Sequence, residues 1–297
     1  MAVTSRLKWA VGSTAFVATL CLGIVCFSGC AKSSGNPITS NDQNISSSAV
    51  TSDVADAVSD ALASNNGGAL DQVNDIFELS AGLGIGAGSS LGKIESDSTV
   101  VNRSYDSTAM AWSLFVYKEK SALPLYFGTW TRSYWYQFIA NGQPQKFRVT
   151  NNVAADNIHH KLLAGTGYYF TPRLVHHLRS ISSDWTASNT NTDSVTINGT
   201  YSRSGVDTIL AAARKGTVLD HSLTLTFVNV RGPRGLRLPR SERTSGTIEG
   251  VYTATITAPG KDPVTVTKTF TVTLGSGSAS FSIDGTRFLS DLATGDH

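Results

Sequence analysis

Cysteine is scarce in this chain, and its three cysteines, Cys21, Cys26 and Cys30, all lie within the first 30 residues. The remainder of the chain contains no thiol, which excludes disulfide bonds and thiolate metal sites from any folded part that follows. The stability of that part must come from an ordinary hydrophobic core, and the length of chain after Cys30 is ample for one.

Charged residues are also few, at 15% of the chain, with a formal net charge of +2. Their distribution is uneven. Residues 30–80 carry seven acidic side chains and only one basic one, whereas basic residues are in excess in the rest of the chain. Such asymmetry indicates either that the two parts have different partners or that they face each other.

Recognisable catalytic patterns are lacking. Residues 88–92 match the nucleophile motif G-x-S-x-G, and residues 82–87 match the dinucleotide motif G-x-G-x-x-A. Both motifs need a strand before them and a helix after them, and here a helical pattern comes before and a strand pattern after. We therefore interpret residues 82–92 as a glycine hinge, and we expect neither enzymatic activity nor a cofactor.

The chain opens with a short basic segment and continues as an apolar run over residues 9–27. Two small residues follow at positions 28 and 29. A basic segment, an apolar core and small residues at a cleavage site are typical of a secretory signal peptide.

The four residues Phe27-Ser28-Gly29-Cys30 resemble the lipobox of bacterial lipoproteins, in which a bulky apolar residue and two small residues precede a cysteine. In that family the cysteine receives a diacylglycerol, the peptide is cut before it, and the new amino terminus is usually acylated. The resemblance implies that residues 1–29 are a signal peptide and that Cys30 is lipidated. It covers residues 1–30 only, and Phe27 replaces the usual leucine.

The lipobox resemblance also implies a location in the cell envelope, on a membrane held through the acyl anchor. Buried acyl chains anchor a protein stably because each CH₂ group contributes about 0.8 kcal/mol. The residue after the cysteine is Ala31 rather than aspartate. By analogy with the family, this favours the outer membrane if the host has two membranes. In the cell envelope, we expect no nucleic-acid partner.

Three further segments follow the signal peptide. Residues 30–51 are rich in Ser, Asn and Gly and predict a flexible tether. Residues 52–94 predict a helical hairpin with a glycine-rich hinge, in which Ser52 caps the first helix and the second spans residues 69–80. Residues 95–297 predict an antiparallel β domain.

The β domain is predicted from an apolar period of two. Residues 264–274 place apolar side chains on one face and five threonines on the other, and residues 222–230 and 247–257 alternate in the same way. Such alternation is typical of antiparallel strands with one buried face. We expect about ten to twelve strands in a long, curved sheet, either a half-barrel or a sandwich. Residues 109–118 and 132–140 are apolar on both faces, which predicts a central position or a covered outer face.

A weak internal repeat, I-x-G followed by an aromatic residue, occurs at residues 197–201, 248–252 and 283–288. A glycine inside a strand leaves a gap that a neighbouring aromatic side chain can cover, or it marks a bulge. The repeat therefore predicts repeated construction of a curved sheet and not a binding site.

The most unusual segment is residues 231–243, in which an arginine recurs at every third position: Arg231, Arg234, Arg237, Arg240 and Arg243. In a polyproline II helix, which has three residues per turn, these side chains would line one edge. Guanidinium groups suit phosphates and carboxylates. The segment has two interpretations. It is a binding site for an anionic lipid or lipopolysaccharide, or it is a solvated loop whose arginines have no common function.

Four of the six histidines form two adjacent pairs, His159-His160 and His176-His177. A hairpin centred near Tyr168 would bring one histidine of each pair together on each face, where two imidazoles can bind Zn²⁺ or Cu²⁺ or sense pH. Two ligands are too few for a structural zinc site, and no carboxylate is placed by the sequence to complete one. We therefore predict no metal site and regard the four histidines as weak candidates.

Two functions remain open. The first is a non-enzymatic, lipid-anchored envelope protein that binds a hydrophobic or anionic component, with the arginine row holding headgroups and the concave sheet face holding tails. Lipid-handling lipoproteins share this pattern of an anchor, helices and long strands, although no motif matches. The alternative is a structural or adhesion lipoprotein that binds a protein partner through a closed β-sandwich. A transmembrane β-barrel and a hydrolase of envelope polymers have less support.

Overall fold

The structure, a computed structural model, describes residues 47–64, 67–83, 98–122, 126–235, 245–275, 278–292 and 295. The lipobox at Cys30, the glycine-rich residues 84–92, and Arg237, Arg240 and Arg243 lie outside the described residues. The expectations about these residues remain predictions.

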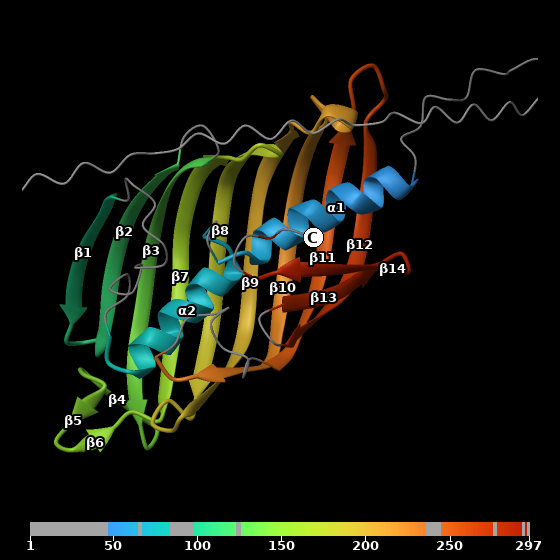
Figure 1. Ribbon diagram of the computed structural model, residues 1–297. Coiled ribbons are helices and arrows are strands. Elements are labelled where there is room, and N and C mark those ends of the chain that lie inside the picture. Colours follow the sequence, from blue (N-terminus) through green and yellow to red (C-terminus); the bar gives the residue numbers. More distant parts are fainter. Residues whose placement is uncertain are drawn as a thin grey trace, which may run out of the picture. The chain divides into compact units, whose positions relative to one another are not determined.

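One antiparallel sheet of 12 strands dominates the described part of the chain (Figure 1). Its long path runs in the order β1-β2-β3-β7-β8-β9-β10-β11-β12-β13-β14, with β4 paired to β3, and β5 and β6 form a separate hairpin. The strands are β1 (Ser98–Asp106), β2 (Ala111–Ala122), β3 (Tyr126–Ala140), β4 (Gln143–Gln145), β5 (Val149–Thr150), β6 (Val153–Ala154), β7 (Asn157–Phe170), β8 (Leu174–Ser188), β9 (Ser194–Ile209), β10 (Val218–Pro233), β11 (Ser245–Thr257), β12 (Val264–Gly275), β13 (Ser278–Ile283) and β14 (Thr286–Asp291).

The predicted fold class is confirmed, because the strands are long, antiparallel and mostly joined to their sequence neighbours. The strands β1 and β14 form the two ends of the sheet and do not pair with each other. Of the two forms that the sequence left open, the chain adopts the open, curved sheet and not a sandwich of two sheets.

The predicted face of each alternating strand is also confirmed. In β11 the buried residues include Ile248, Tyr252, Ala254 and Ile256, and in β10 they include the apolar residues at 223, 225 and 227. In β12 the threonines are exposed while Phe270 and the apolar residues at 272 and 274 are buried. One face of the sheet therefore forms a continuous core, and the other presents hydroxyl groups to solvent.

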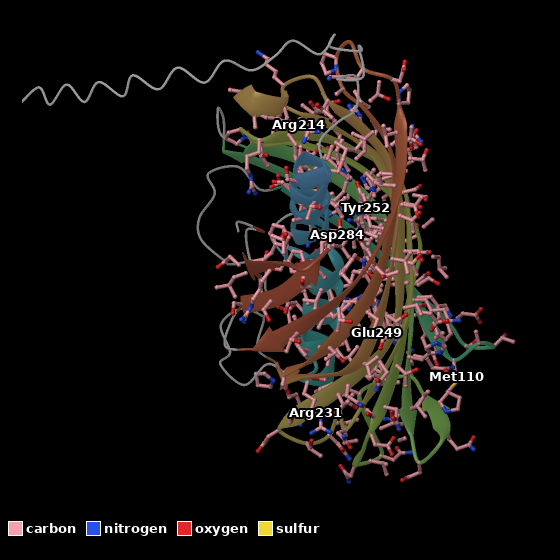
Figure 2. The ribbon with its side chains drawn as sticks, turned by 90° about the vertical axis from the view of Figure 1, so that its right-hand side faces the viewer. Met110, Arg214, Arg231, Glu249, Tyr252 and Asp284 are labelled. Atoms are coloured by element: carbon pink, nitrogen blue, oxygen red, sulfur yellow. The ribbon has the colours of Figure 1, made fainter. Side chains whose placement is uncertain are left out.

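Irregularities in the ladders accompany the curvature of the sheet (Figure 2). The register shifts between Phe227 and Val230 in the pairing of β10 with β9, and again between Leu178 and Ser180 in the pairing of β8 with β9. Asn229, inside the first of these shifts, has a positive φ of 49°. Extra residues of this kind increase the local twist and bend the strand.

The central position expected for the two strands that are apolar on both faces, residues 109–118 and 132–140, is wrong. Strands β2 and β3 are the second and third from the β1 end of the sheet and do not lie at its centre. The inner face of β3 is buried, and on the outer face of β2 Phe115 is 42% exposed. Apolar residues on the outer face of a strand therefore did not indicate, in this chain, that the strand lies at the centre of the sheet.

Two helices lie on the concave side of the sheet: α1 (Ser47–Leu62) and α2 (Ala69–Ser80). Helix α2 has the predicted bounds. The helices lie nearly end to end along the sheet (Figures 1 and 2), so the predicted hairpin is extended and each helix packs on the strands. Neither described helix has the length and apolar composition needed to cross a membrane.

Helix α1 begins at Ser47, five residues earlier than predicted. Val50 is buried one turn before Val54 and extends the apolar stripe of the helix in the N-terminal direction. Ser52 consequently lies inside the helix, where it is exposed, and is not the N-cap. Helix α1 therefore includes residues 47–51, which were expected to belong to the tether.

The strands β13 and β14 cover the side of α1 that faces away from the main sheet (Figure 2). Thr51 Oγ1 donates a hydrogen bond to Asp284 in the turn between these strands, at 3.0 Å, and the Ser64 amide donates to the Leu292 carbonyl, also at 3.0 Å. The helix is thus enclosed on two sides, and the middle of the concave face is filled by protein.

Ion pairs join the acidic helices to basic side chains of the sheet and its loops. Asp53 lies 2.5 Å from Arg214, and three further contacts of 3.8 Å join Asp56 to Arg173, Asp60 to Arg203 and Asp71 to Lys118. Of the two explanations for the uneven charge distribution, these contacts confirm that the acidic and basic parts face each other.

Candidate functional site

A groove of about 320 Å³ lies on the concave side of the sheet near its β1 end. We name it the aromatic groove, and it is lined by Leu79, Gly82, Leu83, Arg103, Trp112, Tyr136, Phe138, Phe147, Arg148 and Val149. Its walls come from three places: strands β1 to β3, the C-terminal end of α2, and the loop that carries the β5–β6 hairpin. In Figure 1 that hairpin lies at the same end of the sheet as the C-terminal end of α2.

The strand register places the aromatic side chains of the groove in a row. Trp112 of β2 pairs directly with Tyr136 of β3, and their rings stack with centroids 6.4 Å apart. Phe138 meets Tyr136 edge-on at 5.6 Å. The indole Nε1 of Trp112 donates to the Lys146 carbonyl at 2.7 Å, which ties the loop to the sheet and brings Phe147 over the row, 6.3 Å from Trp112.

Cationic side chains surround this row. The Arg103 guanidinium lies 5.9 Å from the centre of the Trp112 ring, and the Lys146 ammonium lies 5.2 Å from the centre of the Phe147 ring. Arg148 reaches the C-terminal end of α2, where its Nε would lie 3.2 Å from a Cβ added at Gly82. Gly82 has a φ of +83°, so the helix ends in a left-handed residue that also leaves room for the arginine.

The charge of the groove is one-sided. Among the described residues that line it, two are arginines and none is a carboxylate. Burial raises the pKa of the Tyr136 phenol, and the nearby Arg103 guanidinium opposes that shift. The groove therefore combines aromatic surface with positive charge, which suits a ligand that has an apolar part and an anionic group.

Only the first two arginines of the predicted row are described. Arg231 is exposed in β10, opposite Thr196 of β9, and the Arg234 amide donates to the Asp193 carbonyl at 3.1 Å. Residues 231–233 are thus β-strand and not polyproline II helix. The Gly235 amide donates to the Phe77 carbonyl of α2 at 2.9 Å. The start of the arginine row therefore lies near the C-terminal half of that helix.

The predicted pairing of the histidines is wrong, because the β7–β8 turn lies at residues 171–173 and not at Tyr168. His160 pairs with Trp185, and His176 pairs with Tyr169. The turn chemistry explains the position: Pro172 cannot donate to a ladder, and Thr171 Oγ1 accepts bonds of 3.2 Å from the next two available amides, those of residues 173 and 174.

The four candidate histidines consequently have separate environments. His159 lies 2.7 Å from Asp184 on the outer face, and exposed His177 packs against Tyr168. His160 is fully buried, and His176 is buried beside different residues. No two of these four histidines form the facing pairs that the sequence predicted.

His176 instead belongs to a buried cluster, which we name the His-Asp-His cluster: His176 of β8, Asp207 of β9 and His221 of β10. The ligand atoms of the three residues lie within 4.8 Å of one another. His176 Nδ1 contacts one carboxylate oxygen of Asp207, and His221 Nε2 lies 3.0 Å from the other. The three residues are at most 3% exposed.

Stacked rings hold the cluster in place. The two imidazoles lie 5.8 Å apart, with Tyr169 at 4.7 Å beyond His176 and Tyr252 at 5.4 Å beyond His221. Gly205 lies beneath, and a Cβ there would come within 3.1 Å of the His176 ring and 2.7 Å of the His177 carbonyl. The glycine therefore gives the His176 ring room above β9.

A cavity of about 50 Å³ opens beside the cluster and is lined by Asp207, Asp53, Asp56 and Arg173, among others. Burial would raise the pKa of Asp207, but His176 and His221 outweigh it and hold that pKa below its ordinary value. Burial lowers the pKa of His176 to about 4 and raises that of Asp53 to about 6, the latter in spite of Arg214.

Sequence reasoning did not identify Asp207 or His221. His221 directly precedes the predicted strand 222–230 and shares the face of Leu223 and Leu225, so a polar residue on an apolar strand face was an available signal. Asp207 lies outside the strands that the sequence predicted, and the neighbouring inward positions of β9 include Arg203 and Gly205, so no such signal marked it. Comparisons of the chain with protein-family models, with curated proteins and with solved structures found no match.

Proposed function

We propose that the chain is a non-enzymatic, lipid-anchored protein of the cell envelope, and that its aromatic groove binds an anionic, partly apolar envelope component of the lipid or lipopolysaccharide type. The observation that carries this proposal is the lining of the groove, where a row of aromatic rings adjoins Arg103 and Arg148 without a carboxylate among the described lining residues. In a bacterium with two membranes, the location would be the outer membrane, through Cys30.

The groove changes the binding arrangement that the sequence suggested. Helices α1 and α2 fill the middle of the concave face, so acyl tails cannot spread over it as expected. About 320 Å³ is near the lower limit for small-molecule sites. A groove of this size suits a headgroup with a short apolar segment, or the end of one chain, and not several whole acyl chains.

The alternative function, adhesion to a protein partner, was tied to a closed sandwich. All described strands except β5 and β6 form one open sheet, so this alternative loses its structural basis. A protein partner that uses another surface is an outcome that the following experiment can reveal.

The test is native mass spectrometry of the Cys30→Ser chain, exported by its own host behind an ordinary cleavable signal peptide in place of residues 1–29 and purified without detergent. We expect an additional mass of lipid size on the wild-type groove, because phosphate and carboxylate groups bind guanidinium forks strongly. The double variant Arg103→Gln/Arg148→Gln should lose that mass. The matched control, Arg179→Gln/Arg287→Gln, changes two exposed arginines outside the groove and should keep it.

A third variant separates the groove from the arginine row. Changing Arg231, Arg234, Arg237, Arg240 and Arg243 to Ser should leave the mass in place if the groove alone binds the anion. A clean mass for every protein, wild type included, would contradict ligand binding and favour a protein partner, to be sought by crosslinking in intact cells.

A further inference from the structure

We propose that the His-Asp-His cluster is a site for one divalent metal ion of the imidazole-preferring class, and that Zn²⁺ is its occupant. Two neutral imidazoles and one carboxylate are a donor set that proteins use for such ions. The proposal is independent of the aromatic groove, because none of the three cluster residues lines it.

The first support is convergence. His176, Asp207 and His221 come from three adjacent strands, and each of them offers a ligand atom within 4.8 Å of the others. The stack from Tyr169 to Tyr252 fixes both rings, and Gly205 removes the side chain that would press on His176. Rings that already converge reduce the cost of ordering the ligands around an ion, and only the direct contact between His176 Nδ1 and Asp207 has to open to admit it.

The second support is the state of the donors. The donors that can share an ion with Asp207 are the ring nitrogens that face it, His176 Nδ1 and His221 Nε2. His221 Nε2 lies 3.0 Å from the carboxylate but makes no hydrogen bond within the described part of the chain, and a buried polar atom without a partner is costly. An ion between the two rings and the carboxylate would give that nitrogen a partner. The nearest cationic group on β9, Arg203, is directed to α1, where it binds the Ala57 carbonyl at 3.3 Å and lies 3.8 Å from Asp60.

The third support is the neighbouring cavity of about 50 Å³, whose lining includes Asp207 and Asp53. Such a space holds one or two water molecules, so an ion with three protein ligands has room for a fourth ligand from solvent. Asp56 and Arg173, which also line the cavity, are partly exposed and mark its outer side. The cavity is too small for an organic substrate, so we assign the ion a structural role across β8, β9 and β10.

The experiment uses the full chain in detergent, stripped with a chelator and titrated with Zn²⁺ by calorimetry, with the bound metal measured by elemental analysis after dialysis. We expect one equivalent of Zn²⁺ and a rise of several degrees in the thermal midpoint at saturating metal, because a ligand that binds only the folded state stabilises it. The variant His176→Ala/His221→Ala should bind at least about a hundredfold more weakly.

The control variant His159→Ala/His177→Ala changes the two histidines that lie outside the core and should bind as the wild type does. This pair also separates the cluster from the cysteines near the amino terminus, which are the same in every protein tested. The milder variant Asp207→Asn keeps the shape of the core in case the alanine variant does not fold.

Two results would overturn the proposal. The first is a wild-type chain that retains less than a stoichiometric amount of Zn²⁺ and shows no shift of its thermal midpoint, which requires no variant to fold. The second is full binding by a folded His176→Ala/His221→Ala or Asp207→Asn variant, which would place the ion elsewhere.

Discussion

Among single side chains, His160 is the clearest example of a polar group that the fold keeps neutral. It is 0% exposed on the inner face of β7, and its ring lies 5.3 Å from that of Tyr134. Neither ring nitrogen has a hydrogen-bond partner in the described part of the chain. Burial, reinforced by the neighbouring His159, lowers the pKa of His160 to about 3.

This depressed pKa predicts a loss of stability in mild acid. Below pH 6.5 the unfolded chain takes up a proton on His160 that the folded chain refuses until the pH approaches 3, so the loss falls between these values. Its size is on the order of 2 kcal/mol between pH 7 and pH 5. Urea unfolding of the wild type and of His160→Leu at both pH values checks this, because the variant should lack that part of the loss.

The same substitution at exposed His177 is the control and should leave the acid sensitivity unchanged. His160→Leu should itself cost little at pH 7, since an apolar group of similar size can replace a polar group that makes no hydrogen bond. Equal acid sensitivity in His160→Leu and the wild type would show that other groups cause the loss.

The glycine repeat shows what a local pattern can predict. Gly250 pairs with Phe270 of β12, whose ring atoms would lie 2.2 Å from an added Cβ, so the aromatic ring covers the gap as expected. Gly199 adopts a φ of +149° near the bulge of β10. Gly285, however, lies in the turn between β13 and β14 with open space around it. The pattern predicts the strand glycines and fails where a similar motif forms a turn.

The His-Asp-His cluster was not predictable in the same way. A strand pattern tells which face a side chain occupies, but the neighbours of His176 depend on the register, which the position of one turn decides. Placing that turn at Tyr168 rather than at residues 171–173 shifted every expected partner on β8. His221 could be assigned to the inner face because it continues the pattern of residues 222–230, but Asp207 lay in no predicted strand, and the meeting of the three residues needed the structure.

At the level of helices and strands, the main feature is an acidic helix buried against basic strands. Asp60 of α1 and Arg203 of β9 have side chains that are 5% and 4% exposed, with 3.8 Å between their charged groups. The exposed pair Arg179–Asp220 makes two shorter hydrogen bonds, of 2.8 and 3.0 Å. The exposed Arg179–Asp220 pair should stabilise the fold less than the buried Asp60–Arg203 pair, because water screens the exposed charges and solvates each of them even when they are apart.

We therefore expect Asp60→Asn to destabilise the fold by about 3–5 kcal/mol, because the substitution removes one of the two carboxylates, Asp60 and Asp207, that balance the buried Arg203 guanidinium. Asp220→Asn should cost less than about 1 kcal/mol. Chemical unfolding of both variants measures the difference. Hydrogen exchange should show faster opening of α1 in Asp60→Asn only, and equal costs for the two variants would contradict the assignment.

The strand and helix patterns were predictable to different extents. Alternation gave the buried face of β10, β11 and β12, because a strand with one wet face shows its period directly in the sequence. The first turn of α1 was missed, because its serines look like tether residues and Val50 alone marks the apolar stripe. The place of β2 and β3 near an end of the sheet depends on pairing, which no single strand encodes.

At the level of the whole molecule, the fold is an open curved sheet that needs a cover. A sheet with one apolar face must bury that face against another layer. Here α1 and α2 are that layer, and β13 and β14 return over α1 (Figure 2). The contact between the helices and the sheet was one of the two explanations that the uneven charge distribution suggested. The groove near β1 needs the end of α2 and the loop with β5 and β6 to meet the first strands, and composition does not reveal that meeting.

We predict that the membrane anchor can be removed without a loss of the fold. Within the described residues, which begin at Ser47, α1, α2 and the strands form a hydrophobic core with one another. In the proposed lipoprotein, a Cys30→Ser chain whose residues 1–29 are exchanged for an ordinary cleavable signal peptide should therefore move from the membrane fraction to the soluble fraction of its host. The thermal midpoint should stay within about 2 °C of that of the anchored protein, since that core is unchanged.

Cell fractionation combined with metabolic labelling by a fatty acid measures the first part, and thermal unfolding followed by near-ultraviolet circular dichroism measures the second. Cys26→Ser is the matched control, because it changes a thiol in the same apolar region four residues earlier, and the label should remain on that chain. A Cys30→Ser chain of this kind that stays on the membrane without label would contradict the acyl anchor, because membrane attachment would then have to come from a part of the chain after Cys30.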